Sequence, residues 1–215
     1  MNFETPDDFI ARIEKDQQVN TFFLTQNLGA EVHWFFHEAL KALKSELYLS
    51  ACSSFVIGIE ASIRFTQAQL ESNEIVNKLD PIKTLSNRLL KVAKENGLPI
   101  EKLAFPSETD FNGKLLSTKP DLVNVEIVRL RHHLCHGNIL EFRNSELGDS
   151  DILFTPECVR DLAYDLYQLS KNWVSALAEF RSQKFGISPY ILKMQVVKSQ
   201  SDLPPALTNT KPESD

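Results

Sequence analysis

Residues 30–47, AEVHWFFHEALKALKSEL, decide the fold class of this chain. Their apolar positions recur at steps of three and four, which is the spacing of one face of an α-helix. The residues on this face are Val32, Phe35, Phe36, Ala39, Leu40, Leu43 and Leu47. A helix with a continuous apolar face must bury that face against other elements, so this stretch predicts a long helix inside a packed bundle.

Proline marks where four further helices are expected to begin, because its fixed φ suits the first helical turn, where no N–H donor is needed. Each of these prolines precedes an apolar run with helical spacing; they are Pro6, Pro81, Pro120 and Pro156. The expected helices cover about residues 6–17, 81–96, 120–136 and 156–183, and another covers 50–71. Residues 98–119 contain two prolines, a glycine and polar clusters, and are predicted to form a long loop.

Evidence for strands is thin along the whole chain, with residues 190–197 as the single candidate for a docking strand. The pattern therefore predicts an all-α fold, a helical bundle of five to six helices. Residues 1–185 are expected to form one helical-bundle domain. Residues 186–215 are expected to be a largely flexible C-terminal extension, because serine, proline, threonine and charged residues dominate it.

The composition of the 215 residues is that of a globular protein with a net charge of −6. A net negative charge argues against a protein that binds RNA or DNA non-specifically along its length. It does not exclude an enzyme that binds a single scissile phosphate. No apolar run is long enough to cross a bilayer, and the first residues do not resemble a signal peptide. We therefore expect a cytoplasmic protein with no membrane partner and with three reduced cysteines.

Residues 129–138, RLRHHLCHGN, concentrate two arginines and three of the five histidines of the chain. Histidine can exchange protons near neutral pH, so this cluster is the candidate functional site. On a helical wheel one side carries Arg129, His132, His133 and His136. The opposite, apolar side carries Val123, Ile127, Leu130 and Leu134. Arg131 falls at the boundary between the two sides.

Within this cluster, Arg131 and His136 are separated by four residues and followed by Gly137. This resembles the R-x(4–6)-H motif of HEPN domains, all-α bundles that include many ribonucleases of toxin–antitoxin and phage-defence systems. Arg129 and His136 fit the longer spacing of the same motif. The resemblance covers residues 30–183, with sharp identity in the motif alone. The residue after the motif arginine is most often asparagine in the family and is His132 here.

The resemblance implies a metal-independent endoribonuclease with no cofactor, in which the RNA 2′-OH attacks the neighbouring phosphorus. It implies His136 as the base and Arg131 as the group that stabilises the phosphorane, with His132 as an acid or a phosphate-orienting group. Supporting roles fall to Arg129, His133 and Glu60; the last is a carboxylate in an apolar helix that needs a partner. The resemblance also implies a homodimer with the site at the interface, and an antitoxin or defence partner protein.

Several plainer interpretations remain open. The cluster is also typical of a solvated helix end, and many HEPN-like domains are non-catalytic modules for protein interaction or dimerisation. His33 and His37 have the spacing of a zinc pair, but the order of residues around them is not that of a zinc-protease motif, and a packed helix face is favoured. Cys135 is interpreted as a small core side chain rather than a nucleophile.

Overall fold

The computed structural model describes residues 6–29, 32–72, 76, 78–143 and 154–186. Within these ranges the chain is all-α and contains no strand. The α-helices are α1 (Pro6–Thr25), α2 (His33–Lys44), α3 (Tyr48–Glu71), α4 (Asn87–Glu95), α5 (Phe111–Leu116), α6 (Glu126–Cys135) and α7 (Arg160–Phe185). Three short 3-10 helices are η1 (Ile100–Leu103), η2 (Ile139–Phe142) and η3 (Pro156–Val159). The all-α prediction is confirmed for the described residues.

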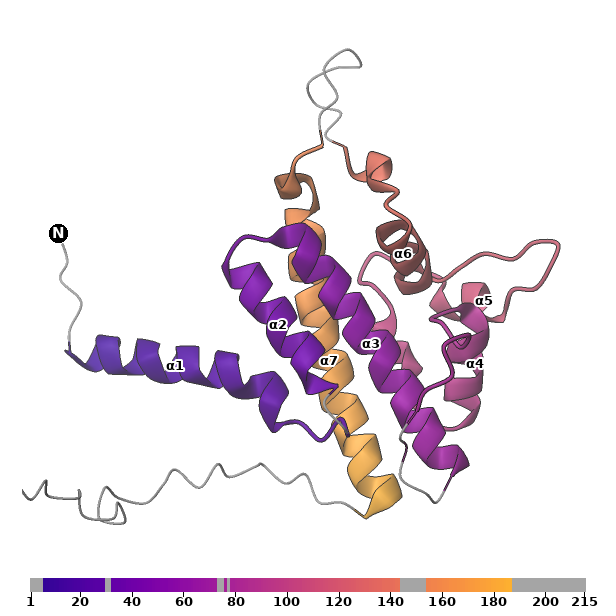
Figure 1. Cartoon of the computed structure of the whole chain (residues 1–215), viewed down its shortest axis with the longest axis horizontal. Helices are drawn as coiled ribbons and strands as arrows, with labels where there is room; N and C mark the ends of the chain where they lie inside the picture. Colours follow the sequence, from indigo (N-terminus) through magenta and orange to yellow (C-terminus); the bar gives the residue numbers. More distant parts are fainter. Residues whose placement is uncertain (1–5, 30–31, 73–75, 77, 144–153, 187–215) are drawn as a thin grey trace, which may run out of the picture.

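The long helices α2, α3 and α7 form the centre of the molecule (Figure 1). A connection of three residues, 45–47, joins α2 to α3, so the two helices pack as an antiparallel hairpin. α7 packs against both of them, and most of α1 extends away from this group. On the other side of α3 lie α4, α5 and α6, which means that α3 separates α6 from the hairpin partner α2.

Aromatic rings fill the core between α1, α2 and α3. Phe23, Phe36 and Phe55 are fully buried, and the Phe23 ring centre lies 5.3 Å from that of Phe36 and 6.3 Å from that of Phe55. A Cβ atom on Gly58 of α3 would lie only 3.0 Å from the Phe36 ring. Glycine at this position therefore lets α2 and α3 approach closely without displacing the Phe36 ring.

Two of the prolines expected to start helices do not do so. α4 begins at Asn87, well after Pro81, and α6 begins at Glu126, well after Pro120. Proline suits a turn as well as a first helical turn, so it marks a change of direction without fixing where the helix begins. The start of α4 is set by Ser86, whose hydroxyl accepts a hydrogen bond of 3.2 Å from the Leu89 N–H.

The predicted loop at residues 98–119 contains two helices, η1 and α5. Their apolar residues are part of the core: Ile100, Leu103, Phe111 and Leu115 are all buried. Each helix is too short to show an apolar period in the sequence, which is why the interpretation as a loop was wrong. With α5 the described residues hold seven α-helices rather than the five to six expected.

Some predictions fall on residues outside the described ranges, namely the strand at 190–197 and the extension at 186–215 beyond its first residue. None of the helices within the described ranges is both long and apolar enough to span a bilayer.

Candidate functional site

The start of α6 is held by side chains that come from other parts of the chain. Val125, the residue before the helix, offers no capping side chain. Its own N–H donates to Asn87 Oδ1 at 3.1 Å, and the N–H of Glu126 donates to Glu108 Oε1 at 2.9 Å. These two acceptors satisfy backbone donors that a helix leaves unpaired at its N-terminus. They therefore fix where α6 begins.

Both anchors have further partners that tie α6 to α5. The Asn87 amide donates to the carbonyl oxygens of Lys114 at 2.9 Å and Val123 at 2.8 Å. The Glu108 side chain is 1% exposed and pairs with the Lys114 ammonium at 3.0 Å. Sequence reasoning missed both residues, because nothing in their local spacing points to a contact with a later helix.

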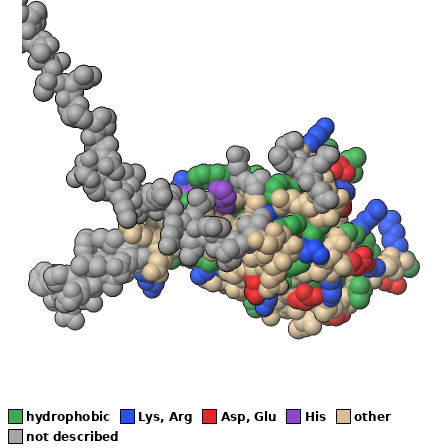
Figure 2. Space-filling view, turned by 90° about the horizontal axis from the view of Figure 1, so that it is seen from below, with side chains coloured by type: hydrophobic (Ala, Val, Ile, Leu, Met, Phe, Trp, Pro, Cys, Tyr) green, Lys and Arg blue, Asp and Glu red, His purple; other side chains and the backbone are tan. Residues whose placement is uncertain are grey.

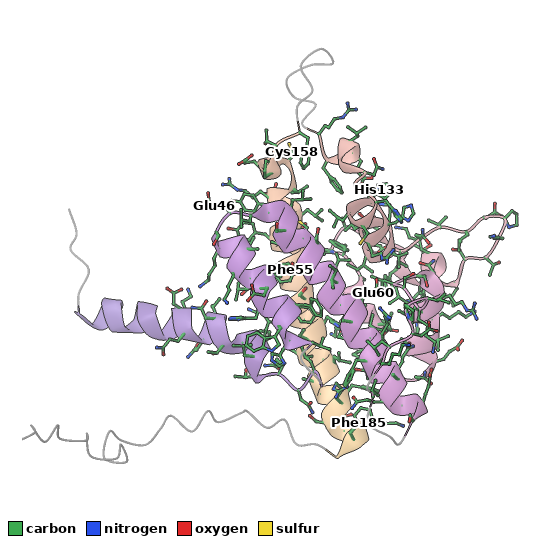
Figure 3. The ribbon with its side chains drawn as sticks, in the orientation of Figure 1. Glu46, Phe55, Glu60, His133, Cys158 and Phe185 are labelled. Carbon is green, nitrogen blue, oxygen red and sulfur yellow. The ribbon has the colours of Figure 1, made fainter. Side chains whose placement is uncertain are left out.

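Arg131 lies on the inner side of α6, facing α3. Its Nε atom donates to Glu60 Oε2 at 3.0 Å, and the other oxygen of Glu60 accepts from Arg64 Nη1 at 3.4 Å. The three side chains are 20%, 13% and 17% exposed for Arg131, Glu60 and Arg64. Glu60 is on α3 next to α6 in Figure 3, and it is the partner that binds the motif arginine. We call these three residues the inner triad.

The inner triad has a net charge of +1, because two guanidinium groups share one carboxylate. The bond to Glu60 uses only Nε of Arg131, and no other hydrogen bond of this side chain joins it to a described residue. Its terminal nitrogens are therefore free to bind an anion, with Glu60 fixing the direction of the guanidinium plane.

Arg129 lies on the outer side of α6 and is bound by two carboxylates. Its Nε and Nη2 atoms donate to the Glu126 carboxylate at 2.8 and 2.6 Å, and Nη1 donates to Glu141. The hydrogen bond with Arg129 holds the pKa of Glu126 below its ordinary value, and the same pairing raises the pKa of Arg129. We call Arg129, Glu126 and Glu141 the outer triad; one guanidinium and two carboxylates give it a net charge of −1.

His133 also belongs to the outer side. Its Nδ1 atom contacts the Glu141 carboxylate and lies 3.0 Å from the Asn138 amide nitrogen. Because Glu141 is part of η2, these contacts hold the chain after α6 against the helix that precedes it. In Figure 3, His133 is drawn at the side of α6 that faces away from Glu60.

His132 and His136 form an exposed pair at the C-terminal end of α6. Their ring centres are 4.4 Å apart and the ring planes are inclined by 53°. His136 follows the last helical residue, and Gly137 turns the chain away with a φ of +68°. The helix thus ends at the pair, and both imidazole rings are presented to solvent.

The structure separates residues that the helical wheel had grouped together. Arg129 and His133 are engaged with carboxylates, whereas His132 and His136 face each other. Arg131, placed at the boundary by the wheel, faces α3. No hydrogen bond joins Arg131 to His136 among the described residues. Within the described part of one chain the two motif residues are therefore not hydrogen-bonded to each other.

Two expectations about the surroundings of the cluster were wrong. Val123 precedes the helix and is 51% exposed, so the buried side of α6 consists of Ile127, Val128 and Leu130, with Leu134 partly buried. Cys135 is exposed, because α6 ends there and this position points away from the core. Helical spacing alone does not reveal where the last packed turn stops.

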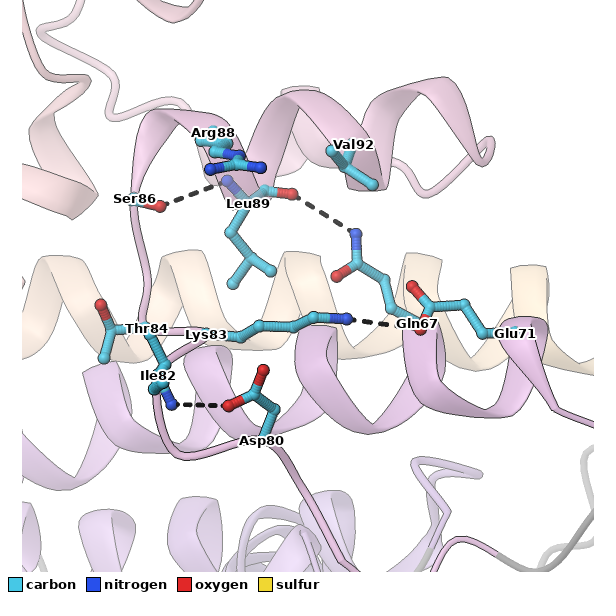
Figure 4. A pocket seen from close by; sticks show the side chains of 10 residues that line it. All are labelled: Gln67, Glu71, Asp80, Ile82, Lys83, Thr84, Ser86, Arg88, Leu89 and Val92. Carbon is cyan, nitrogen blue, oxygen red and sulfur yellow. Dashed lines mark hydrogen bonds and ion pairs between the residues drawn. The ribbon is translucent and has the colours of Figure 1, made fainter.

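A cavity of about 460 Å³ lies between α3 and α4, away from α6 (Figure 4). Its polar groups bind one another: Lys83 pairs with Glu71 at 3.3 Å, and the Gln67 amide donates to the Leu89 carbonyl at 3.4 Å. Side chains of both charges are mixed across the face shown in Figure 2. Neither feature offers a concentration of charge or of reactive groups comparable to α6.

His33 and His37 of α2 differ from the histidine pair of α6 in having an aromatic side chain beside them. The Trp34 ring lies beside both, with centres 5.1 Å from His33 and 5.8 Å from His37, and Glu38 pairs with Lys41. Trp34 is 49% exposed and both histidines are half-buried, so this face of α2 is only partly covered.

Comparison of the chain with protein-family models, with curated proteins and with solved structures finds no significant match. The functional conclusion therefore depends on the residues of α6 and their contacts.

Proposed function

We propose that this protein is a metal-independent endoribonuclease of HEPN type that cleaves RNA at the end of α6. The observation that carries the proposal is that α6 ends with two kinds of group: Arg131, which is fixed by Glu60, and the exposed pair of His132 and His136. A fixed guanidinium with net positive surroundings and two neighbouring imidazoles are the groups that phosphoryl transfer from RNA needs.

In the proposed reaction the RNA 2′-oxygen bonds to the adjacent phosphorus, and the bond from phosphorus to the 5′-oxygen breaks. His136 accepts the proton of the 2′-OH as general base. His132 donates a proton to the departing 5′-oxygen as general acid. The products are a 2′,3′-cyclic phosphate and a 5′-hydroxyl, so DNA, which lacks the 2′-OH, is not cut. The 4.4 Å separation of the rings allows one phosphodiester to meet both.

Arg131 stabilises the negative charge that develops on the phosphorane. The inner triad has a net charge of +1, whereas the outer triad around Arg129 has −1. A phosphate is therefore attracted to Arg131 and repelled by the carboxylates at Arg129. This difference favours Arg131 over Arg129 as the functional arginine, with Arg129 and His133 holding the helix end in place.

We further propose that the active form is a homodimer in which two α6 ends meet. Within one chain Arg131 faces α3 while the histidine pair faces solvent, so a second copy would bring the two kinds of group together. An antitoxin or defence partner protein that covers the same helix end would keep the enzyme inactive.

The test is incubation of the purified protein with RNA in the presence of EDTA. Cleavage is expected to persist with EDTA and to fall by about 100-fold or more in His136→Ala and in Arg131→Ala. Arg88→Ala removes an exposed arginine on α4 and serves as the matched control, with unchanged cleavage. Absence of cleavage by the wild-type dimer, or equal rates in all variants, would refute the proposal; circular dichroism verifies that each variant is folded.

A second candidate is a non-catalytic HEPN-like helical module for protein interaction or dimerisation. It is favoured by the large apolar side chains left exposed on and after α5, namely Leu116, Leu122 and Val123. In this case changing Leu116 and Leu122 to aspartate weakens association measured by light scattering or pull-down, and His136→Ala leaves it unchanged. Growth arrest on expression that His136→Ala relieves would decide against this candidate.

A further inference from the structure

We infer that His132 and His136 together form a chelating site for one divalent transition-metal ion, such as Zn²⁺, Ni²⁺ or Cu²⁺. Binding there blocks the proposed ribonuclease reaction. The metal site itself follows from the geometry of the histidine pair, and only the inhibition rests on the proposed function.

The spacing and separation of the rings suit a shared metal ion. Residues four apart on a helix lie on the same side, one turn above the other. With metal–nitrogen bonds of about 2.0 Å, an ion lies roughly 3.2 Å from each ring centre. Ring centres 4.4 Å apart then subtend an angle of about 90° at the metal, which four- and six-coordinate transition metals accept.

Both rings are available to bind. Each is exposed, and no hydrogen bond engages a ring nitrogen of either histidine among the residues the structure describes. His133, next to them in the sequence, differs because its Nδ1 is occupied by Glu141 and Asn138. The cluster of three histidines therefore supplies two metal ligands.

The charges around the pair do not oppose a cation. The inner triad contributes a net charge of +1 and the outer triad a net charge of −1, which sum to zero. The positive charge left on the inner triad is thus offset by the negative charge left on the outer triad. A divalent ion approaching the exposed rings meets no net repulsion from α6 and its partners.

The site differs from that of a resident cofactor. In the described ranges no group of three or more His, Cys, Asp or Glu residues is arranged to hold a metal. Two imidazoles leave the remaining positions to water, so the ion exchanges readily and does not support the fold. Imidazole ligands select Zn²⁺, Ni²⁺ and Cu²⁺ over Mg²⁺ and Ca²⁺, which prefer oxygen.

Inhibition follows from how the ring nitrogens are used. A nitrogen whose lone pair binds a metal cannot accept a proton, and a ring nitrogen without a proton cannot donate one. A single ion therefore removes the general base and the general acid at once. The proposed enzyme, which needs no metal, is then expected to be active with EDTA and inactive with low concentrations of Zn²⁺.

The binding test is isothermal titration calorimetry, with Ni²⁺ and Zn²⁺ titrated into the full-length chain without a histidine tag. One ion per chain is expected, with binding lost in His132→Ala and in His136→Ala, and no binding of Mg²⁺. His37→Ala is the matched control, because His33 and His37 are the other pair with the same spacing but have the Trp34 ring beside them. Binding that survives His132→Ala and His136→Ala, or that disappears in His37→Ala, would overturn the site.

The activity test adds Zn²⁺ to the RNA cleavage assay and then EDTA in excess. Cleavage is expected to stop and then recover fully. Metal binding by a wild-type protein that never cleaves RNA would count against the proposed function while the metal site stands. RNA cleavage that continues in the presence of Zn²⁺, together with no Zn²⁺ or Ni²⁺ binding in the titration, would overturn the metal site while the proposed function stands.

Discussion

Arg129 and Arg131 lie two residues apart on α6, yet different parts of the chain hold them. The partner of Arg131 is Glu60, 71 residues earlier in the sequence and on a different helix. The partners of Arg129 are Glu126, three residues earlier, and Glu141, twelve residues later. A contact within one helix stabilises that helix, whereas a contact between helices fixes their relative position. The inner triad therefore depends on the tertiary fold, and the outer triad depends mainly on α6 and the chain that follows it.

The difference also concerns charge and solvent. The inner triad is largely shielded and retains a positive charge, while the outer triad is more exposed and retains a negative one. Ionic contacts weaken as exposure grows, because water and salt screen them. The inner triad is expected to matter both for folding and for anion binding, and the outer triad to matter little for either.

The largest difference is expected in the thiol reactivity of two cysteines: Cys135 at the exposed end of α6 and Cys52 in the core of α3. Burial raises the pKa of the Cys52 thiol to about 12, which leaves roughly one thiol in 10⁴ ionised at pH 8. Cys135 is exposed at the histidine pair. Mass spectrometry after brief treatment with a thiol reagent is expected to find Cys135 modified and Cys52 intact. Equal labelling of both in the folded protein would show that the end of α6 is not presented as described.

Glu60→Gln is expected to produce the largest loss of stability among changes to the two triads. It leaves two largely buried guanidinium groups without a counter-charge, at a cost of about 3 kcal/mol in the free energy of unfolding. Glu126→Gln, the matched change in the outer triad, is expected to cost less than about 1 kcal/mol. Urea unfolding followed by circular dichroism measures both, and equal losses would contradict the distinction between the triads.

Glu108→Gln tests whether the start of α6 is anchored from a distance. The carboxylate is buried and accepts from Lys114 and from the Glu126 N–H, so the change is expected to cost about 2 kcal/mol. Asp110→Asn is the matched control, because it alters an exposed carboxylate that caps the short helix α5. A loss no greater than that of the control would mean that Glu108 does not hold α6.

The smallest effect is expected from the pH dependence of the outer triad. Arg129 lowers the pKa of Glu126 in the folded state, so this group contributes stability above its ordinary pKa of 4.5. That contribution is lost as the pH falls through the lowered pKa. The stability difference between the wild type and Glu126→Gln should therefore shrink between about pH 6 and pH 3. A stability difference that grows as the pH falls over this range would contradict the prediction.

Apolar periodicity predicted α2, α3 and α7 well, because each shows it over several turns. α1 was predicted too short, since it continues to Thr25 rather than ending near residue 17. Periodicity failed for α5, which is too short to show a period, and for the start of α6, which is set by groups distant in the sequence. Asn87 and Glu108 cap α6 across 38 and 18 residues of sequence, a relation that no local motif carries.

Part of the candidate site was also accessible from the sequence. Glu60 stood out as a carboxylate among apolar and small residues, and the structure supplies its partner, Arg131. The separation of Arg129 and His133 from His132 and His136 was not accessible. It depends on Glu141, which the turn after Gly137 brings back onto α6.

The most direct measurement is the rate of RNA cleavage in EDTA by Arg131→Ala and Arg129→Ala, assayed side by side at the same protein concentration. If the inner triad supplies the catalytic charge, Arg131→Ala lowers the rate by about 100-fold or more and Arg129→Ala by less than about 10-fold. A larger loss in Arg129→Ala than in Arg131→Ala, with both variants folded, would contradict the role assigned to the inner triad.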